Sequence, residues 1–195
     1  YLVVAADTPA FNAAHPGIDN GTNVFGPWIG RLQNSGETIE LEDAAGRRAD
    51  RVQYADEGDW AIRARGPLDN GHEGWTWVAA HDGGGSSLEL INPTLSNNRG
   101  QNWASSAVAG GSPGAVNSVA SGSGAPLILN VRHEPVIPRS SDTVVITAEL
   151  EHATITHPPT LHWRADDQES WSSQDLIDNG RGELNAEIPG HPDGT

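Results

Sequence analysis

Residues 37–43 read Glu-Thr-Ile-Glu-Leu-Glu-Asp, with Ile39 and Leu41 on one parity and polar side chains between them. A period of two is typical of a β-strand that buries one face. Turn formers lie on either side, Asn34-Ser-Gly36 before the run and Asp43-Ala-Ala-Gly46 after it. The stretch therefore predicts a strand bounded by tight turns.

Strand signals continue on both sides of this stretch. Gly30–Asn34 precedes it and Arg47–Tyr54 follows it, and the same alternation places Val52 and Tyr54 inward. Strands joined by turns of about three residues form an antiparallel meander. We therefore predict an all-β fold.

The rest of the first half carries weaker signals. Thr8 offers a helix N-cap and Pro9 suits the first helical position, which predicts a short helix over residues 9–14. Residues 55–85 read as less regular. The other predicted segments are strands at residues 2–5, Leu88–Ile91 and Trp103–Ser106, and loops at residues 15–28 and Ser96–Gln101.

A second β pattern follows a Ser/Gly-rich stretch, residues 118–125, which reads as a flexible linker. A tryptophan, Trp163, on the third strand of this series suits an Ig-like sandwich. About 70 residues follow the linker, whereas a complete Ig domain has ~100, so we expect this module to be truncated with an open sheet edge. The predicted strands are Leu127–Val131, Thr143–His152, Thr160–Arg164 and Leu184–Ile188.

Composition limits the classes of function. The chain of 195 residues has no cysteine, which excludes disulfides and thiol chemistry, and its formal net charge is −15. Such a charge repels polyanions, so nucleic acid is not an expected partner. No apolar run approaches the ~20 residues of a membrane span, so membrane insertion is not expected either. Five arginines interleave with acids and read as a salt-bridged sheet face, namely Arg47, Arg48, Arg51, Arg63 and Arg65.

Catalytic and metal-binding patterns are weak. Gly110-Gly-Ser112-Pro-Gly114 matches the G-x-S-x-G nucleophile elbow, but Pro113 lacks the N–H that an oxyanion hole needs. His152, His157 and His162 lie around one strand–loop–strand unit, yet their spacing does not enforce the convergence that zinc requires. We therefore predict no catalytic, cofactor-binding or metal-ligating residue, and no enzyme.

Two acidic loops and two tryptophans stay as candidate binding features. Residues 56–59 and 69–73 carry carboxylates that suit calcium but lack EF-hand spacing, so a stabilising calcium ion is the one cofactor left open. Trp75 and Trp171 lie in loop-like polar surroundings, where an exposed position is open to them, and Trp75 is the better binding candidate. Packing in the core or as an anchor of a loop is nevertheless the favoured interpretation. The tryptophans predicted to pack inward are Trp60, Trp77, Trp103 and Trp163.

An ordered set of short motifs resembles the lamin-tail domain family in its bacterial branch, over roughly residues 1–117. The set comprises the opening Val-Val-Ala strand with Phe11, Gly26-Pro-Trp28-x-Gly30-x-Leu32-x-Asn34-x-Gly36-Glu37, Ile39-x-Leu41-x-Asp43-x-x-Gly46, Tyr54, Trp60, Trp77, Asp82-Gly-x-Gly85-x-Ser87-Leu88-Glu-Leu90, Trp103 and Ser112-Pro-Gly-Ala-x-Asn117. This sequence departs from the family pattern by an added loop at residues 66–76.

The resemblance implies an Ig-like β-sandwich without enzymatic activity. Similar bacterial domains sit in large secreted or surface proteins, beside nucleases, phosphoesterases or spore-coat-type kinases, and before Ig-like or fibronectin-like modules. Residues 126–195 resemble such a trailing module more loosely. We therefore expect two Ig-like β-sandwich modules, residues 1–117 and 126–195, with the linker 118–125 between them and the second module truncated.

The expected function is that of a non-catalytic structural or adhesive module of a larger extracellular or cell-surface bacterial protein. We expect it to contact a protein or cell-surface partner and to be joined to further domains of the same parent chain. The predicted contact face combines the loop 66–76 with the acidic loop 56–59. The alternative is an accessory module that binds carbohydrate or a divalent cation beside a secreted enzyme.

Overall fold

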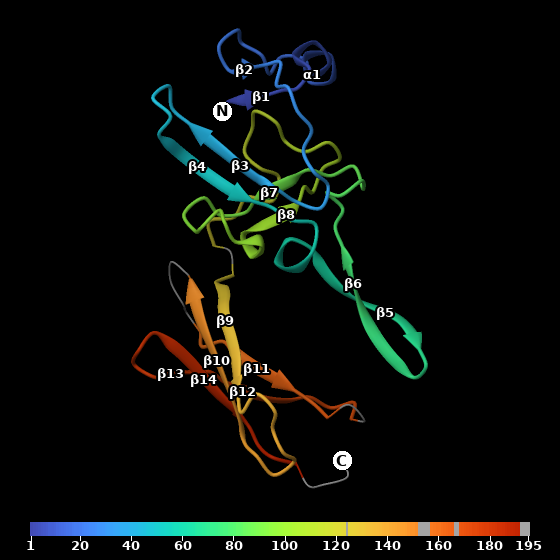
Figure 1. Cartoon of the computed structure of the whole chain (residues 1–195), viewed down its shortest axis with the longest axis vertical. Helices are drawn as coiled ribbons and strands as arrows, with labels where there is room; N and C mark the ends of the chain where they lie inside the picture. Colours follow the sequence, from blue (N-terminus) through green and yellow to red (C-terminus); the bar gives the residue numbers. More distant parts are fainter. Residues whose placement is uncertain (124, 152–156, 166–167, 192–195) are drawn as a thin grey trace. The chain divides into compact units, whose positions relative to one another are not determined.

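The computed structural model describes residues 1–123, 125–151, 157–165 and 168–191. The chain divides into two compact units, Tyr1–Gly124 (unit 1) and Ala125–Thr195 (unit 2), coloured blue to yellow-green and yellow to red in Figure 1. Both units are built mainly from strands, which confirms the all-β prediction. The sheets are small, and the assignment of each unit as an Ig-like sandwich stays a prediction.

Unit 1 pairs its strands locally. Strands β1 and β2 are parallel, whereas the other pairs, β3–β4, β5–β6 and β7–β8, are antiparallel, and each pair forms a two-stranded sheet. The elements are β1 (Val3–Val4), α1 (Thr8–Ala14), β2 (Val24–Phe25), β3 (Thr38–Glu42), β4 (Arg48–Gln53), η1 (Gly58–Trp60), β5 (Ile62–Asp69), β6 (His72–Val78), β7 (Leu88–Leu90), η2 (Gly100–Asn102) and β8 (Trp103–Ser105).

The β3–β4 hairpin confirms two of the three strands predicted for the meander. Ile39 of β3 lies opposite Val52 of β4, as the alternation requires. The prediction of a strand at Gly30–Asn34 is wrong, because this segment is irregular and ends in a turn. That turn packs on the end of β4: a Cβ at Gly36, whose φ is +113°, would lie 2.3 Å from the Tyr54 carbonyl oxygen.

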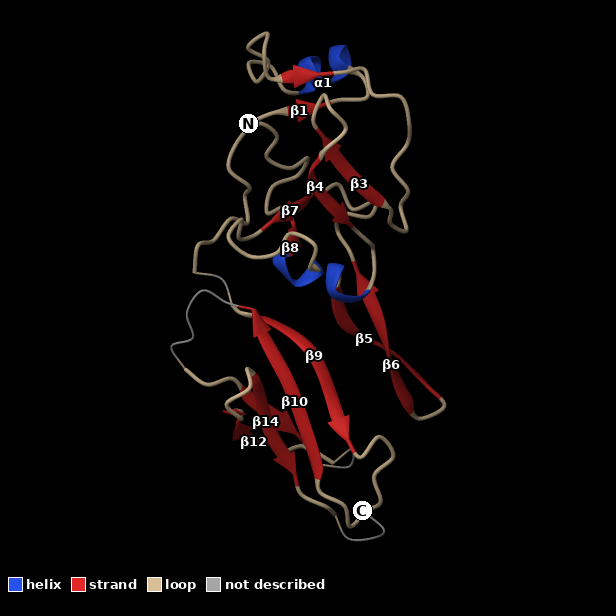
Figure 2. Ribbon diagram, turned by 60° about the vertical axis from the view of Figure 1, so that its left-hand side comes forward, coloured by secondary structure: helices blue, strands red, loops and turns tan. Residues whose placement is uncertain are grey.

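The segment expected to be irregular, residues 55–85, contains the long β5–β6 hairpin. Its tip is Asn70-Gly71, with φ of 49° and 83°, which is the pattern of a type I′ turn. The added segment 66–76 is therefore the outer part of a hairpin and not a loop, which corrects the prediction. Figures 1 and 2 show this hairpin extending away from the rest of unit 1.

The N-terminal segment follows the prediction in outline. Helix α1 forms where expected, but its N-cap is Asp7 and not Thr8, since an Asp7 carboxylate oxygen accepts the Ala10 N–H at 2.8 Å. The predicted loop 15–28 contains the short strand β2, which pairs with β1 and adds a sheet that the sequence pattern did not indicate.

The buried interior of unit 1 is largely polar. Its buried polar residues are Glu89, Asn92, Asn102 and Ser106, and its buried hydrophobic residue is Ala5. Asn102 is 1% exposed; its side-chain oxygen accepts the Asn92 N–H, and its amide donates to the carbonyls of Asn92 and Ser96. Hydrogen bonds therefore tie the 92–102 loop to the start of β8.

Unit 2 has a four-stranded antiparallel sheet in the order β13-β14-β10-β9, with a separate β11–β12 pair, and Figure 1 labels these six strands. Ala148 of β10 and Ala186 of β14 are buried with Leu176, and Leu161 and Leu184 pack against them. The elements are β9 (Leu127–Glu134), β10 (Val144–Glu151), β11 (Thr160–Trp163), β12 (Ser172–Asp175), β13 (Ile177–Asp178) and β14 (Glu183–Ile188).

Candidate functional site

The β5–β6 hairpin presents an aromatic ring covered by arginines. Arg65 lies opposite Trp75 across the hairpin, and Arg63 is two residues away on the same strand. The guanidinium carbons of Arg63 and Arg65 lie 3.8 and 4.3 Å from the Trp75 ring centroid, within cation–π range. Trp75 is nevertheless 49% exposed, so the alternative of an exposed ring holds and not the favoured interpretation of a packed one. The stacking fixes three long side chains in one arrangement at the surface.

Large apolar side chains share the surface of this hairpin. Trp77, which was predicted to pack inward, is 43% exposed, so that prediction is wrong. Among the described strands β6 pairs with β5 alone, and this two-stranded hairpin leaves much of the Trp77 ring at the surface. The exposed large apolar residues of the hairpin are Ile62, Leu68, Trp75, Trp77 and Val78.

The acidic loop 56–59 leads directly into the hairpin. Its last residues form η1, and Asp59 accepts a hydrogen bond from the Gln101 side chain at 3.1 Å. The next residue, Trp60, is half-buried, with its ring centroid 5.8 Å from that of Trp103. The two segments of the predicted contact face are thus consecutive along the chain, and the aromatic pair anchors the link between them.

A groove of about 550 Å³ opens between residues of the β3–β4 and β7–β8 hairpins. Its polar lining residues are Gln33, Asn34, His81 and Asp82. Most of the lining is apolar or aromatic, and it includes Leu32, Ile39, Val52, Tyr54, Leu88 and Trp103. Sequence reasoning assigned several of these side chains to a closed core, whereas Ile39 is 45% exposed.

Two polar groups in the wall of the groove, the Tyr54 hydroxyl and the Trp103 indole N–H, are bonded within unit 1, whereas His81 Nε2 is buried without a hydrogen-bond partner in the described part of the chain. The Tyr54 hydroxyl donates to the Gln33 carbonyl at 2.6 Å, and the Trp103 indole N–H donates to the Asn97 carbonyl at 2.7 Å. Burial raises the pKa of the Tyr54 phenol, and the negative charge of Glu37 raises it further. His81 Nδ1 lies 3.1 Å from the Ser105 hydroxyl. The wall therefore offers mainly apolar contact.

Ser112, of the G-x-S-x-G pattern, is bonded to a buried carboxylate. Its hydroxyl and N–H both donate to Glu89 Oε1, at 2.5 and 2.9 Å, and those of Ser118 donate to Oε2 at 2.6 and 2.7 Å. Burial raises the pKa of Glu89, but these hydrogen bonds outweigh it and hold that pKa below its usual range. The arrangement fastens residues 112–118 onto β7.

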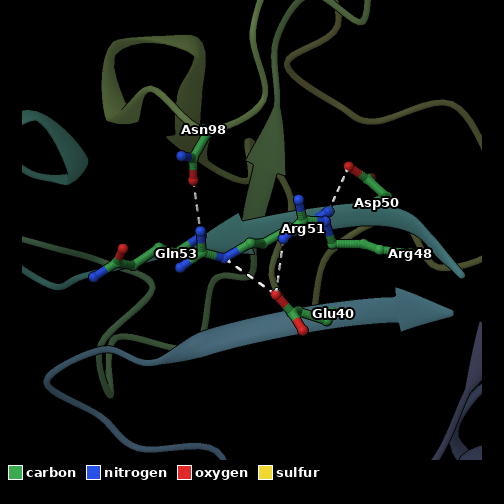
Figure 3. A network of polar contacts seen from close by, with 6 residues as sticks. All are labelled: Glu40, Arg48, Asp50, Arg51, Gln53 and Asn98. Carbon is green, nitrogen blue, oxygen red and sulfur yellow. Dashed lines mark hydrogen bonds and ion pairs between the residues drawn. The ribbon is translucent and has the colours of Figure 1, made fainter. Parts of the chain in front are cut away.

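The arginines that read as one patch lie on two hairpins. On β3–β4, Arg48 and Arg51 both approach a Glu40 carboxylate oxygen, at 3.4 and 3.3 Å (Figure 3), and Arg47 pairs with Asp43. Arg63 and Arg65 belong to β5. The arginines of β3–β4 therefore belong to a salt-bridged face of that hairpin, and the five arginines do not form a single cationic patch.

Two of the three histidine candidates for a metal site, His157 and His162, lie in the described part of the chain. His152 lies outside the described residues, and His162 is exposed on β11. Within residues 1–123, 125–151, 157–165 and 168–191, no group of three His, Asp or Glu side chains is placed to hold a metal ion. Of the remaining tryptophans, Trp103 and Trp163 are half-buried, and Trp171 is exposed.

Comparisons with known proteins found no matching family model, no matching curated protein and no matching solved structure. In the described part of the chain, no helix has the length and apolar character needed to cross a membrane. The functional argument therefore depends on the surfaces of unit 1 themselves.

Proposed function

We propose that the chain is a non-catalytic binding module of a larger secreted or cell-surface bacterial protein, and that hairpin β5–β6 contacts a protein partner. The exposed apolar and aromatic surface of this hairpin is the observation that carries the proposal. Extended exposed apolar surface on a soluble domain is typical of interaction sites. Leu68, next to the tip, is 73% exposed.

The chemistry of the hairpin suits a protein interface. Tryptophan and arginine are the side chains most enriched among residues that dominate binding energy. Because Arg63 and Arg65 already stack on Trp75, less side-chain freedom is lost when a partner binds.

The alternative, carbohydrate binding by an accessory module, finds less support at this position. A sugar ring binds tryptophan by stacking on its face, where it would compete with the guanidinium groups of Arg63 and Arg65. The geometry of Trp75 therefore favours a protein partner over a glycan.

Saturation binding of the labelled chain to intact cells of the source bacterium tests the proposal. Trp75→Ala should weaken binding roughly tenfold or more, the loss expected when a dominant interface residue is truncated. Trp171→Ala is the matched control, because Trp171 is 59% exposed and also lies near an arginine, with Arg164 5.1 Å from its ring. Its binding should equal that of the unmodified chain. Cell binding that survives deletion of residues 67–75 would contradict the proposal.

A further inference from the structure

The groove of unit 1 has the size and the lining of a ligand site. Its volume of about 550 Å³ lies within the range of ~300–1,000 Å³ that is usual for such sites. Leu32, Ile39 and Val52 give it an aliphatic side, and Tyr54 and Trp103 give it aromatic edges. The hydroxyl of Tyr54 and the indole N–H of Trp103 are already used within unit 1. The wall thus favours apolar side chains over a hydroxyl-rich sugar.

Among the described residues, the lining of the groove carries one acidic side chain, Asp82, and no lysine or arginine. Asp56 and Glu57 follow the lining residue Ala55 directly in the chain. The Glu37 carboxylate lies near enough to act on the Tyr54 phenol. An occupant that carries a positive charge is therefore complementary to this rim.

A second copy of this chain is opposed by its overall charge. Each copy has a formal net charge of −15, so long-range repulsion acts against association of two copies.

We propose that the groove of unit 1 binds a peptide segment that combines apolar side chains with cationic ones. This inference rests on the proposed function, since it specifies the chemistry of a protein partner. The apolar side chains would cover Leu32, Ile39 and Val52, and the cationic groups would reach the acidic rim at Asp82.

Titration of the full chain with a capped pentapeptide of alternating leucine and arginine tests the inference. The reference probes alternate leucine with glutamate and serine with arginine. We expect saturable binding of the leucine–arginine peptide, which weakens as salt is raised because the charge attraction is screened. The reference peptides should bind at least roughly fivefold more weakly, because each lacks one of the two kinds of contact.

Two pairs of variants locate the binding. Asp82→Lys should weaken peptide binding roughly fivefold, the upper range for an exposed charge pair, and Glu187→Lys in unit 2 is its charge-matched control. Ile39→Thr should weaken binding by a similar factor through lost apolar contact, with Ile177→Thr, also on an exposed strand position, as its control. Asp82 is exposed, so its replacement tests the groove even where Ile39→Thr disturbs folding.

Several results would overturn the inference. The first is equal binding of the serine–arginine and leucine–arginine peptides. The second is an equal effect of Asp82→Lys and Glu187→Lys on peptide binding. The third is that the chain binds no peptide but binds a neutral oligosaccharide, and that Ile39→Thr abolishes this oligosaccharide binding. The proposed function fails separately, because its test uses Trp75 and cell binding. If the peptide does not bind the groove, the result for Trp75 and cell binding still stands. If the hairpin does not bind cells, the result for the peptide and the groove still stands.

Discussion

Units 1 and 2 bury different kinds of side chain. The buried residues of unit 1 include a carboxylate and two asparagines, Glu89, Asn92 and Asn102, whereas the core of unit 2 centres on Ala148, Leu176 and Ala186. Buried polar groups are tolerated only where they are hydrogen-bonded, and those of Asn102 and Glu89 are. Unit 1 is thus specified by directional bonds and unit 2 by apolar contact.

This difference has a consequence for binding. Unit 1 buries few apolar side chains. Others lie at the surface of the β3–β4 and β5–β6 hairpins, where Ile39, Leu41 and Leu68 are exposed. Unit 2 uses its leucines to hold two sheets together. We therefore place both candidate binding surfaces in unit 1.

The largest stability effect should come from the core of unit 2. Leu176 is 8% exposed and packs with Ala148 and Ala186. Leu176→Ala should lower the free energy of unfolding of unit 2 by about 3 kcal/mol, from lost burial and the cavity left behind. Hydrogen exchange followed by mass spectrometry reads each unit separately. Faster exchange throughout unit 1 would contradict the division into two differently held units.

A smaller loss is expected from the polar interior of unit 1. Asn102→Ala removes the partners of the Asn92 N–H and of the Asn92 and Ser96 carbonyls. Leaving such buried groups unbonded should lower the stability of unit 1 by about 2 kcal/mol. The same exchange experiment should show faster exchange near β7 and β8. The control Asn98→Ala removes an exposed side chain that accepts the Gln53 N–H (Figure 3) and should cost less.

Acid should destabilise the two units through different carboxylates. The folded-state pKa of Glu89 lies below its ordinary 4.5, so its contribution is fully present above about pH 4.5 and is lost as pH falls through the folded-state value. Glu183 in unit 2 behaves likewise, chiefly because the Arg132 side chain hydrogen-bonds to it. High salt should weaken the exposed Arg132–Glu183 contribution but not that of Glu89, which has serine partners.

The Glu89 effect has its own control. In Glu89→Gln, unit 1 should be less stable at neutral pH, and its remaining dependence on pH at acid values, below the ordinary 4.5 of Glu89, should flatten. Acid unfolding of unit 1 that matches the unmodified chain would show that the Ser112–Glu89 and Ser118–Glu89 bonds contribute little.

The smallest stability effect should come from the hairpin. Trp75→Ala removes an exposed ring and its stacking with Arg63 and Arg65, a change of at most about 1 kcal/mol. Cell binding should nevertheless fall. A large loss of stability of unit 1 with no loss of cell binding would show that Trp75 stabilises the fold of unit 1 and does not contact the partner.

Strands with a clear alternation could be predicted from the sequence. Thr38–Glu42 and Val144–Glu151 alternate apolar and polar residues, and both are strands. Ser172–Asp175 is polar throughout and exposed, so no periodic signal marked it as β12. Its strand character comes from pairing with β11, which sequence pattern alone does not reveal.

The β5–β6 hairpin carried a signal that was overlooked. Asn70-Gly71 between two strand-forming runs is the strongest short-range hairpin marker, since both residues adopt positive φ readily. Interpretation of residues 69–73 as an acidic loop concealed it. The sequence pattern left an exposed Trp75 as the less favoured alternative, and it indicated neither the stacking of Trp75 on Arg63 and Arg65 nor the exposure of Trp77.

The groove and the Glu89 cluster could not be predicted at all. The groove combines residues from Leu32 to Trp103, so its lining includes residues from two separate two-stranded sheets far apart in sequence. Alternation places Glu89 on the opposite face from Leu88 and Leu90, which suggests solvent. It is 4% exposed because residues 112–118 cover that face.

The fastening of residues 112–118 also bears on how the protein responds to force. This segment leads toward unit 2, and it is held by Ser118 on Glu89 and by the Asn117 amide on the Leu90 carbonyl. A force applied through unit 2 therefore acts on unit 1 at β7, once the hydrogen bond from the Ser121 N–H to the Ile91 carbonyl has broken. The serine–carboxylate contacts act as the mechanical anchor that the load must break before the strands of unit 1 are drawn apart.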